Sequence, residues 1–135
     1  METREAAERF VRVWERAWAE HDVDALLALY AEGCVHRSMP FREPHRGRDE
    51  LAAYLRRSFA DERVVDVRFG APVIGEHGVA VAEFRVLAEE GEGAASTLAG
   101  CVIVRFDAEG FAVEARDYWH SAPGHQEPAG PLSLG

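Results

Sequence analysis

The sequence has no lysine, because all 15 of its basic residues are arginines. Apart from the N-terminal amine, the chain therefore has no amine that could form a Schiff base with a carbonyl compound or with pyridoxal phosphate. Acidic residues exceed basic ones by nine, and the arginines are scattered among acids instead of forming a basic stripe. This charge pattern is unsuited to tracking a phosphate backbone, so we expect no nucleic acid as a partner.

Cysteine is scarce, and long apolar runs are missing. Cys34 and Cys101 lie far apart and form no CxxC pair, which argues against a zinc knuckle or thioredoxin-type chemistry and fits a reducing compartment. No apolar run approaches the eighteen or so residues of a membrane helix. Residues 1–5 enter an amphipathic pattern without the features of a signal peptide. We therefore predict a cytoplasmic protein that does not enter a membrane.

Motifs for metals and nucleotides are also missing. The histidines show no HExxH or other close ligand spacing, and no glycine-rich loop follows a strand and opens a helix. The acidic residues at 89, 90 and 92 are interpreted as a solvated hairpin tip. The sequence thus predicts no metal site and no bound cofactor.

The first half of the chain has the periodicity of helices. A chain of 135 residues has room for one core, and 47% of its residues are apolar. An apolar stripe at the helical period predicts a helix over 5–20, and Asp22 and Gly33 are placed to begin and end a second one. A short strand over 34–38, an irregular loop over 39–47 and a third helical stripe over 51–59 follow.

The second half alternates with a period of two, which is typical of strands. The predicted strands, separated by glycine-containing turns, are 64–74, 79–88, 96–106 and 111–120. Helices followed by an antiparallel meander predict an α+β fold, with three helices packed on one face of a curved antiparallel sheet. We expect one domain over 1–120. The Pro- and Gly-rich tail over 121–135 is expected to be mobile or folded over a rim.

This order of elements resembles the nuclear transport factor 2-like superfamily, and more narrowly the SnoaL-like proteins. The resemblance is carried by the segments DVD (22–24), LYAE (29–32), MPFREPHRGRD (39–49) and RDYWH (116–120). It covers nearly everything before the tail. It implies a cone-shaped α+β barrel around an apolar pocket for a small molecule, and related proteins commonly form homodimers.

The resemblance does not select an activity, since the superfamily includes ketosteroid isomerases, polyketide cyclases, dehydratases, epoxide hydrolases and members that only bind or dimerise. The tyrosine and two aspartates of the ketosteroid isomerases would fall here on Trp14, Ser38 and Val102. None of the three is retained. A carboxylate base and a donor to the enolate are therefore lost, which disfavours ketosteroid isomerase activity by the usual mechanism.

The pocket itself is expected to survive. The resemblance keeps Tyr30 and Trp119 in place and puts an aromatic residue, Tyr54, at a pocket position of the third helix. Large aromatic side chains elsewhere are interpreted as core or pocket wall. The predicted ligand-binding set is Trp14, Tyr30, Ser38, Tyr54, Phe59, Phe84, Val102 and Trp119.

Strand alternation points to a His–Asp pair. If Trp119 faces the cavity, Asp117 faces it too, and the resemblance makes the face shared by His36 and Ser38 the pocket side. An imidazole oriented by a carboxylate can act as a general acid or base near neutral pH. In the alternative interpretation, these are ordinary hydrogen-bonded structural groups, with Asp117 paired to an arginine such as Arg42 or Arg37.

Two functional hypotheses follow. The first is a cofactor-independent isomerase, cyclase or dehydratase acting on a small apolar carbonyl or polyketide-like compound, with His36 and Asp117 moving protons. The second is a module that only binds a hydrophobic ligand, or only supports dimerisation.

The outer face of the sheet suggests a partner. Cys101 and Ile103 place apolar groups on this face, beside the charged residues Glu83, Arg85, Glu114 and Arg116. An isologous contact would cover such a half-apolar surface without blocking the cavity. We predict a homodimer through it.

Overall fold

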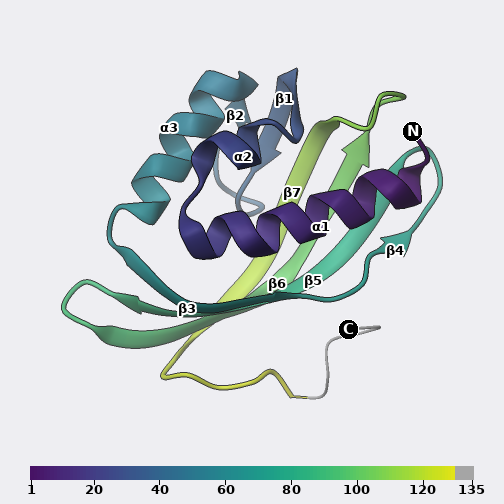
Figure 1. Cartoon of the computed structure of the whole chain (residues 1–135). Helices are drawn as coiled ribbons and strands as arrows, with labels where there is room; N and C mark the ends of the chain where they lie inside the picture. Colours follow the sequence, from purple (N-terminus) through teal and green to yellow (C-terminus); the bar gives the residue numbers. More distant parts are fainter. Residues whose placement is uncertain (130–135) are drawn as a thin grey trace.

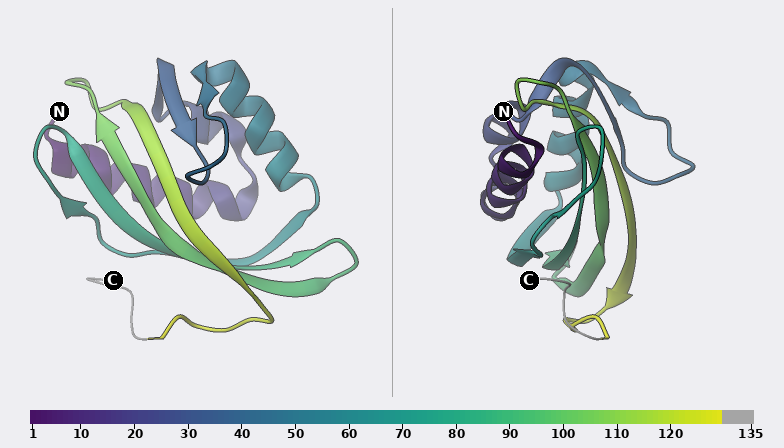
Figure 2. Two further views of the ribbon diagram at one scale, coloured as in Figure 1. Left: turned by 180° about the vertical axis from the view of Figure 1, so that it is seen from behind. Right: turned by 90° about the vertical axis from the view of Figure 1, so that its right-hand side faces the viewer.

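A computed structural model describes residues 1–129, and within this range the chain forms three helices and a seven-stranded sheet. The helices are α1 (Thr3–Glu20), α2 (Val23–Leu27) and α3 (Gly47–Phe59). The strands are β1 (Tyr30–Arg37), β2 (His45–Arg46), β3 (Glu62–Phe69), β4 (Val73–Ile74), β5 (Val79–Glu90), β6 (Ala94–Phe106) and β7 (Ala112–Pro123). All three helices lie on one side of the curved sheet (Figures 1 and 2). The predicted α+β class is confirmed.

Helix α1 forms where the apolar stripe predicts it. Ala6, Phe10, Trp14 and Ala17 are buried on one face, and the charged residues occupy the other. The helix ends at His21, whose backbone is left-handed (φ 54°) and whose N–H bonds to the carbonyl of Trp18. This sharp end turns the chain toward α2.

Helix α2 is much shorter than predicted. Asp22 caps it, since its carboxylate accepts a hydrogen bond from the Ala25 N–H, but the helix has only five residues. The prediction that the helix continues to Gly33 is wrong, because Tyr30 already starts strand β1 and is completely buried. Pairing of β1 with β7 and burial of Tyr30 outweigh the local helix propensity.

The sheet has the order β2-β1-β7-β6-β5-β3, and β4 pairs with β5. Strands β3, β5, β6 and β7 form the predicted antiparallel meander. The expectation of a purely antiparallel sheet needs correction, because β1 pairs with β7 in parallel. The predicted strand 64–74 is also split into β3 and β4 around Pro72, which has no N–H to donate to a ladder.

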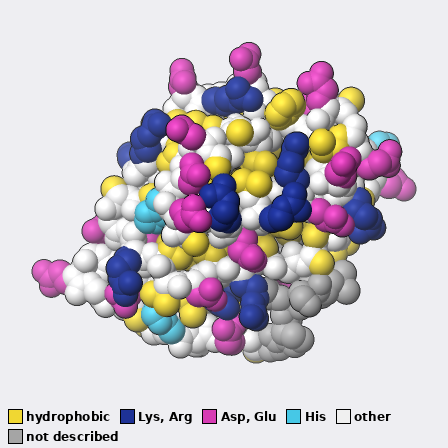
Figure 3. Space-filling view, viewed as in Figure 1, with side chains coloured by type: hydrophobic (Ala, Val, Ile, Leu, Met, Phe, Trp, Pro, Cys, Tyr) yellow, Lys and Arg dark blue, Asp and Glu magenta, His cyan; other side chains and the backbone are white. Residues whose placement is uncertain are grey.

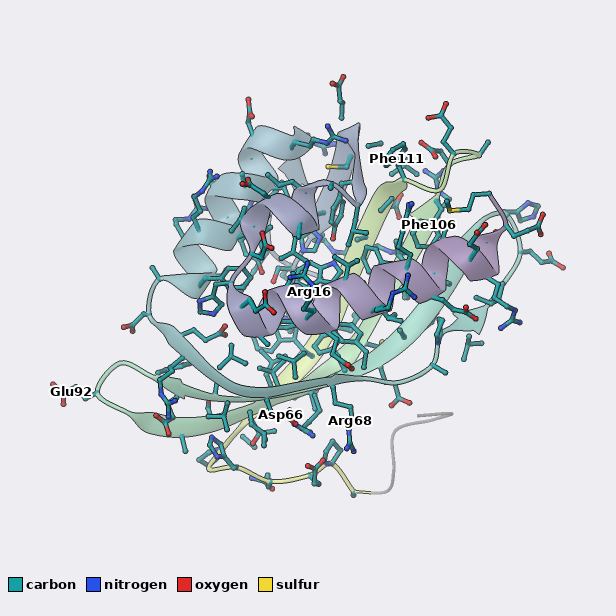
Figure 4. The ribbon with its side chains drawn as sticks, viewed as in Figure 1. Arg16, Asp66, Arg68, Glu92, Phe106 and Phe111 are labelled. Carbon is teal, nitrogen blue, oxygen red and sulfur yellow. The ribbon has the colours of Figure 1, made fainter. Side chains whose placement is uncertain are left out.

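The core lies between the helices and the inner face of β5 and β6. On the inner face of β5, the small side chains of Ala80 and Ala82 are followed by the larger Phe84 and Val86. The ring of Phe10 packs edge-on against Phe106, with their centroids 5.7 Å apart. The β5–β6 hairpin extends beyond this core, so that Glu92 at its tip points away from the body (Figure 4).

The C-terminal segment folds back across the outer face of the sheet (Figure 1). Strand β7 runs to Pro123, past the expected boundary at 120. Arg85 lies beneath this segment, only 2% exposed, with its guanidinium 2.9 Å from an Asp66 carboxylate oxygen and 3.1 Å from one of Glu127. The expectation that Arg85 adds charge to an open outer face is therefore wrong. The rest of the predicted tail, 130–135, lies outside the described residues.

The surface matches the dispersed charge of the sequence. Acidic and basic side chains are interspersed on the face that carries α1, without a continuous basic stripe there (Figure 3). No helix in residues 1–129 combines the length and apolar character needed to cross a membrane.

Candidate functional site

The helices and the inner face of the sheet enclose a cavity of about 190 Å³. Its wall is largely aromatic, with side chains from α1, α3 and the five strands β1, β3, β5, β6 and β7. The ten residues predicted to bind or transform a ligand all line it: Trp14, Tyr30, His36, Ser38, Tyr54, Phe59, Phe84, Val102, Asp117 and Trp119. The structure thus brings them together, and their functional roles stay predictions.

His36 and Asp117 meet across two neighbouring strands. The parallel register places His36 of β1 beside Ala115 of β7, so that Asp117, two residues further along, points to the same side. Nε2 of His36 lies 3.3 Å from Oδ2 of Asp117. The imidazole is 2% exposed and the carboxylate 18% exposed. Nε2 has no well-aligned hydrogen-bond acceptor among the described residues, so this is a contact at ion-pair distance.

Neither of the two arginines considered as partners of Asp117 pairs with it among the described residues. Arg37 donates a hydrogen bond to the Tyr118 hydroxyl at 2.8 Å. Arg42 lies over the ring of Trp119, 5.5 Å from its centroid. The interpretation of Asp117 as one half of an arginine bridge is therefore wrong, and the carboxylate keeps a free edge toward the cavity.

Tyr30 lies behind the imidazole. Its hydroxyl is 3.4 Å from Nδ1 of His36, and its ring is completely buried. Burial, followed by the negative charge of Asp117, raises the pKa of Tyr30 well above its usual value, although the nearby Trp14 indole opposes this. The tyrosine therefore stays a neutral hydroxyl that can donate a hydrogen bond.

Ser38 is held by two aromatic residues. The Tyr54 hydroxyl donates to Oγ of Ser38 at 2.7 Å, and the indole N–H of Trp119 donates to the Ser38 carbonyl at 3.1 Å. Burial is the main cause that raises the pKa of Tyr54, which keeps that hydroxyl protonated. Because Oγ of Ser38 already accepts from Tyr54, its own proton is available to an acceptor in the cavity.

Glu62 is a second carboxylate in the cavity wall, and the sequence did not single it out. Its Oε1 accepts a hydrogen bond from Nε1 of Trp18 at 3.2 Å and lies 3.2 Å from Nε2 of His21. The side chain is 15% exposed. Burial raises the pKa of Glu62 above its usual value, although His21 and Trp18 act in the opposite direction. A glutamate at a helix-to-strand junction carries no local signal that would mark it.

The sequence model of the SnoaL-like domain family matches residues 7–115 of the chain. The chain belongs to the SnoaL-like domain family. No protein with a curated description matches it.

Solved structures confirm the fold of this SnoaL-like protein. The Mycobacterium tuberculosis protein RV0760c has a TM-score of 0.77 at 18% identity, over 92% of this chain and 100% of that one. A Xanthomonas campestris pv. campestris protein proposed to be a polyketide cyclase has a TM-score of 0.72 at 22% identity, over 88% and 93% of the two chains. A computationally designed 17-OHP binder has a TM-score of 0.75 at 19% identity, over 88% and 98%.

The SnoaL-like domain offers no obvious metal centre. Within residues 1–129, no three histidine, cysteine or carboxylate side chains gather in a way that could hold a metal ion. The acid–base groups of the cavity occur instead as the two pairs described above, His36 with Asp117 and His21 with Glu62.

The raised pKa of Glu62 predicts a pH dependence of stability. In the folded state the carboxyl holds its proton to higher pH than in the unfolded chain. The free energy of unfolding should therefore fall as pH rises from about 4.5 through the folded-state pKa. His21 and Trp18 lower this pKa and Glu90 raises it, so these three residues modify the pH range over which the free energy of unfolding falls.

Urea denaturation at a series of pH values from about 4 to 8 measures the effect. We expect Glu62→Gln to remove this part of the slope, and Glu92→Gln at the exposed hairpin tip to leave it unchanged (Figure 4). Equal slopes for wild type and Glu62→Gln would contradict the assignment of a raised pKa to Glu62.

Proposed function

We propose that this SnoaL-like protein binds a small, largely apolar carbonyl compound and moves a proton next to the carbonyl group without a cofactor. One observation carries the proposal: a carboxylate, Asp117, faces an aromatic cavity while a buried imidazole, His36, stands 3.3 Å behind it. A base of this kind suits isomerisation, cyclisation or dehydration.

Asp117 is the group that touches the ligand. Its side chain is 18% exposed, whereas that of His36 is 2% exposed and lies between Tyr30 and Asp117. The Asp117 carboxylate takes a proton from the carbon next to the carbonyl. The electron pair of the broken C–H bond forms the C=C bond of the enolate, and the π pair of the carbonyl moves to the oxygen. Asp117 then returns the proton to the carbon or to a neighbouring position. His36 positions the carboxylate.

The enolate oxygen formed in this step needs a hydrogen-bond donor. Ser38 supplies it, since its Oγ accepts from Tyr54 and its proton is directed elsewhere. Tyr54 and Ser38 thus act as a relay in which each hydroxyl orients the next. Trp119 fixes the relay by bonding to the Ser38 carbonyl.

Structures of related architecture support this reaction class. Besides the Xanthomonas protein proposed to be a polyketide cyclase, a Bacillus subtilis protein proposed to be an isomerase has a TM-score of 0.76 at 20% identity, over 89% of this chain and 90% of that one. Sequence identities this low support only a shared architecture. The proposed activity therefore rests on Asp117 and its surroundings.

Proton exchange tests the proposal without knowledge of the natural substrate. In D2O, the wild-type protein should accelerate the replacement of hydrogen by deuterium at the carbons next to the carbonyl of cyclohexanone or acetophenone, which proton NMR follows. Ketones that bind, as judged by thermal shift, but do not exchange would favour a non-catalytic binding module. Absence of both binding and exchange would overturn the proposal.

The outer face of β6 and β7 is the proposed homodimer interface. Cys101 and Ile103 are half-buried there, and the C-terminal segment covers the neighbouring region around Arg85 without covering them completely. An isologous contact would bury the remaining apolar surface. Ile103→Glu should convert a dimer to a monomer in size-exclusion chromatography with light scattering, and Glu92→Arg should not. A wild-type monomer would rule this interface out.

The proposed location is the cytoplasm. Both cysteines are free thiols, Cys34 in the core and Cys101 on the sheet. Unpaired cysteines fit a reducing compartment. Thiol labelling in freshly lysed cells should find both of them reduced, and oxidised cysteines would contradict this location.

A further inference from the structure

We infer that Glu62 is a second ligand anchor of the cavity, and that the ligand is a compact carbonyl compound with a hydroxyl group at the end far from its carbonyl. This inference rests on the proposed function, because it assumes that the carbonyl lies near Asp117 and Ser38.

The two carboxylates lie on opposite sides of the cavity. Asp117 of β7 pairs with Val102 of β6, which pairs with Ala82 of β5. Glu62 lies on β3, beyond β5, and pairs with Glu90, eight residues further along β5 than Ala82. The two carboxylates are therefore separated both across the strands and along them. A ligand that contacts Asp117 at one end can therefore meet Glu62 only at its other end.

Glu62 is held in one orientation by the end of α1. Both of its contacts, with Nε1 of Trp18 and Nε2 of His21, fall on Oε1. The His21 ring is itself stacked on Phe59, with centroids 4.5 Å apart and planes at 5°. Trp18 and Phe59 also line the cavity. The carboxylate is thus preorganised at the cavity wall before any ligand arrives.

Within residues 1–129, no donor bonds to the second carboxylate oxygen of Glu62, Oε2. A structural link between α1 and β3 would explain the contacts of Oε1 but not the position of Oε2. Oε2 is not one of the fully buried polar atoms that lack a partner, so it keeps accessible surface at the cavity wall. It can therefore accept a hydrogen bond from a ligand hydroxyl in the cavity.

The volume sets the size of the ligand. The cavity has a volume of about 190 Å³. It is smaller than the roughly 300–1,000 Å³ of pockets for drug-sized ligands. A molecule of one ring with short substituents fits, and its largely aromatic wall suits an apolar ring.

Matched ligands test the inference. Acetophenone is compared with its 3-hydroxy, 4-hydroxy and 4-hydroxymethyl derivatives, which place a hydroxyl at increasing distance from the carbonyl. Affinities are measured by titration calorimetry on wild type, Glu62→Leu, Glu62→Gln and the control Glu92→Gln, whose residue lies at the exposed hairpin tip (Figure 4). The affinity for acetophenone reports whether the cavity of each variant is intact.

We expect at least one hydroxylated ligand to bind wild type about tenfold or more tightly than acetophenone, since hydrogen bonds to charged groups are the strong ones. The ratio of the affinity for this hydroxylated ligand to the affinity for acetophenone should fall to about one in Glu62→Leu and should be reduced in Glu62→Gln. Acetophenone itself should bind all four proteins alike. Glu92→Gln should keep the wild-type ratio of the two affinities.

The two possible failures can be told apart. If acetophenone and its derivatives bind wild type equally, or if Glu62→Leu and Glu62→Gln both keep the ratio, the anchor is disproved and the proposed function stands. If none of the four ligands binds wild type, both the proposed carbonyl pocket and the proposed Glu62 anchor are disproved.

Discussion

Asp117→Asn is expected to slow the exchange of protons next to a ketone carbonyl by about 10²–10⁴-fold, the usual contribution of a positioned general base. Asparagine has nearly the same shape, but its amide cannot take up the proton. Ligand affinity should change by only a few fold, because the aromatic wall that binds the ring is untouched. Exchange rates by proton NMR and affinities by calorimetry separate the two effects.

Two further variants refine this test. Glu114→Gln, on the same strand but paired with Arg116, should exchange at the wild-type rate. His36→Gln should lower the exchange rate and displace its pH profile, as expected of a positioning residue that acts through Asp117. Full activity of Asp117→Asn would mean that the base lies elsewhere, with Glu62 the next candidate.

Gly100→Ala is expected to destabilise the fold by about 4 kcal/mol or more, which is at the extreme of single substitutions. Gly100 lies opposite Trp119 in the β6–β7 pair. A Cβ at this position would overlap the carbonyl oxygen of Tyr118 and come within 2.6 Å of Cα of Trp119. Because these are backbone atoms, the two strands would have to separate. Urea denaturation measures the loss.

Gly33→Ala provides the matched control, because a Cβ there would meet nothing within 4 Å. Its stability should stay within about 1 kcal/mol of wild type, or rise slightly as the unfolded chain loses freedom. Gly100→Ala with the stability of Gly33→Ala would show that β6 and β7 are not in close contact beside Trp119. The close contact matters for the site, since Trp119 orients Ser38.

Local periodicity was sufficient for much of the fold. Helix α1 and strands β5 and β6 lie where the apolar patterns predict them, within a few residues. Residues 30–33 were assigned to a helix because their local pattern continues that of α2. They belong to a strand because Tyr30 pairs in parallel with Ala112 of β7, some eighty residues later in the sequence, and the pairing resumes at Val35 after an irregularity.

The candidate site was also predictable only in part. Strand alternation placed His36 and Asp117 on the cavity side once the resemblance had indicated which side of each strand faces the pocket, because a period of two determines the side of every residue on a strand once one is known. The partner of Asp117 was not predictable from spacing, since Arg37 and Arg42 were equally available.

By itself, the sequence determined the fold class, the main helices and strands and ten of the residues that face the cavity, because these follow from short-range periodicity and from the resemblance to the SnoaL-like proteins. Only the tertiary structure decided that β1 runs parallel to β7, that the C-terminal segment covers Arg85 and that Glu62 joins the cavity wall. Each of these depends on contacts between segments far apart in the chain, whose energies leave no periodic trace in the local sequence.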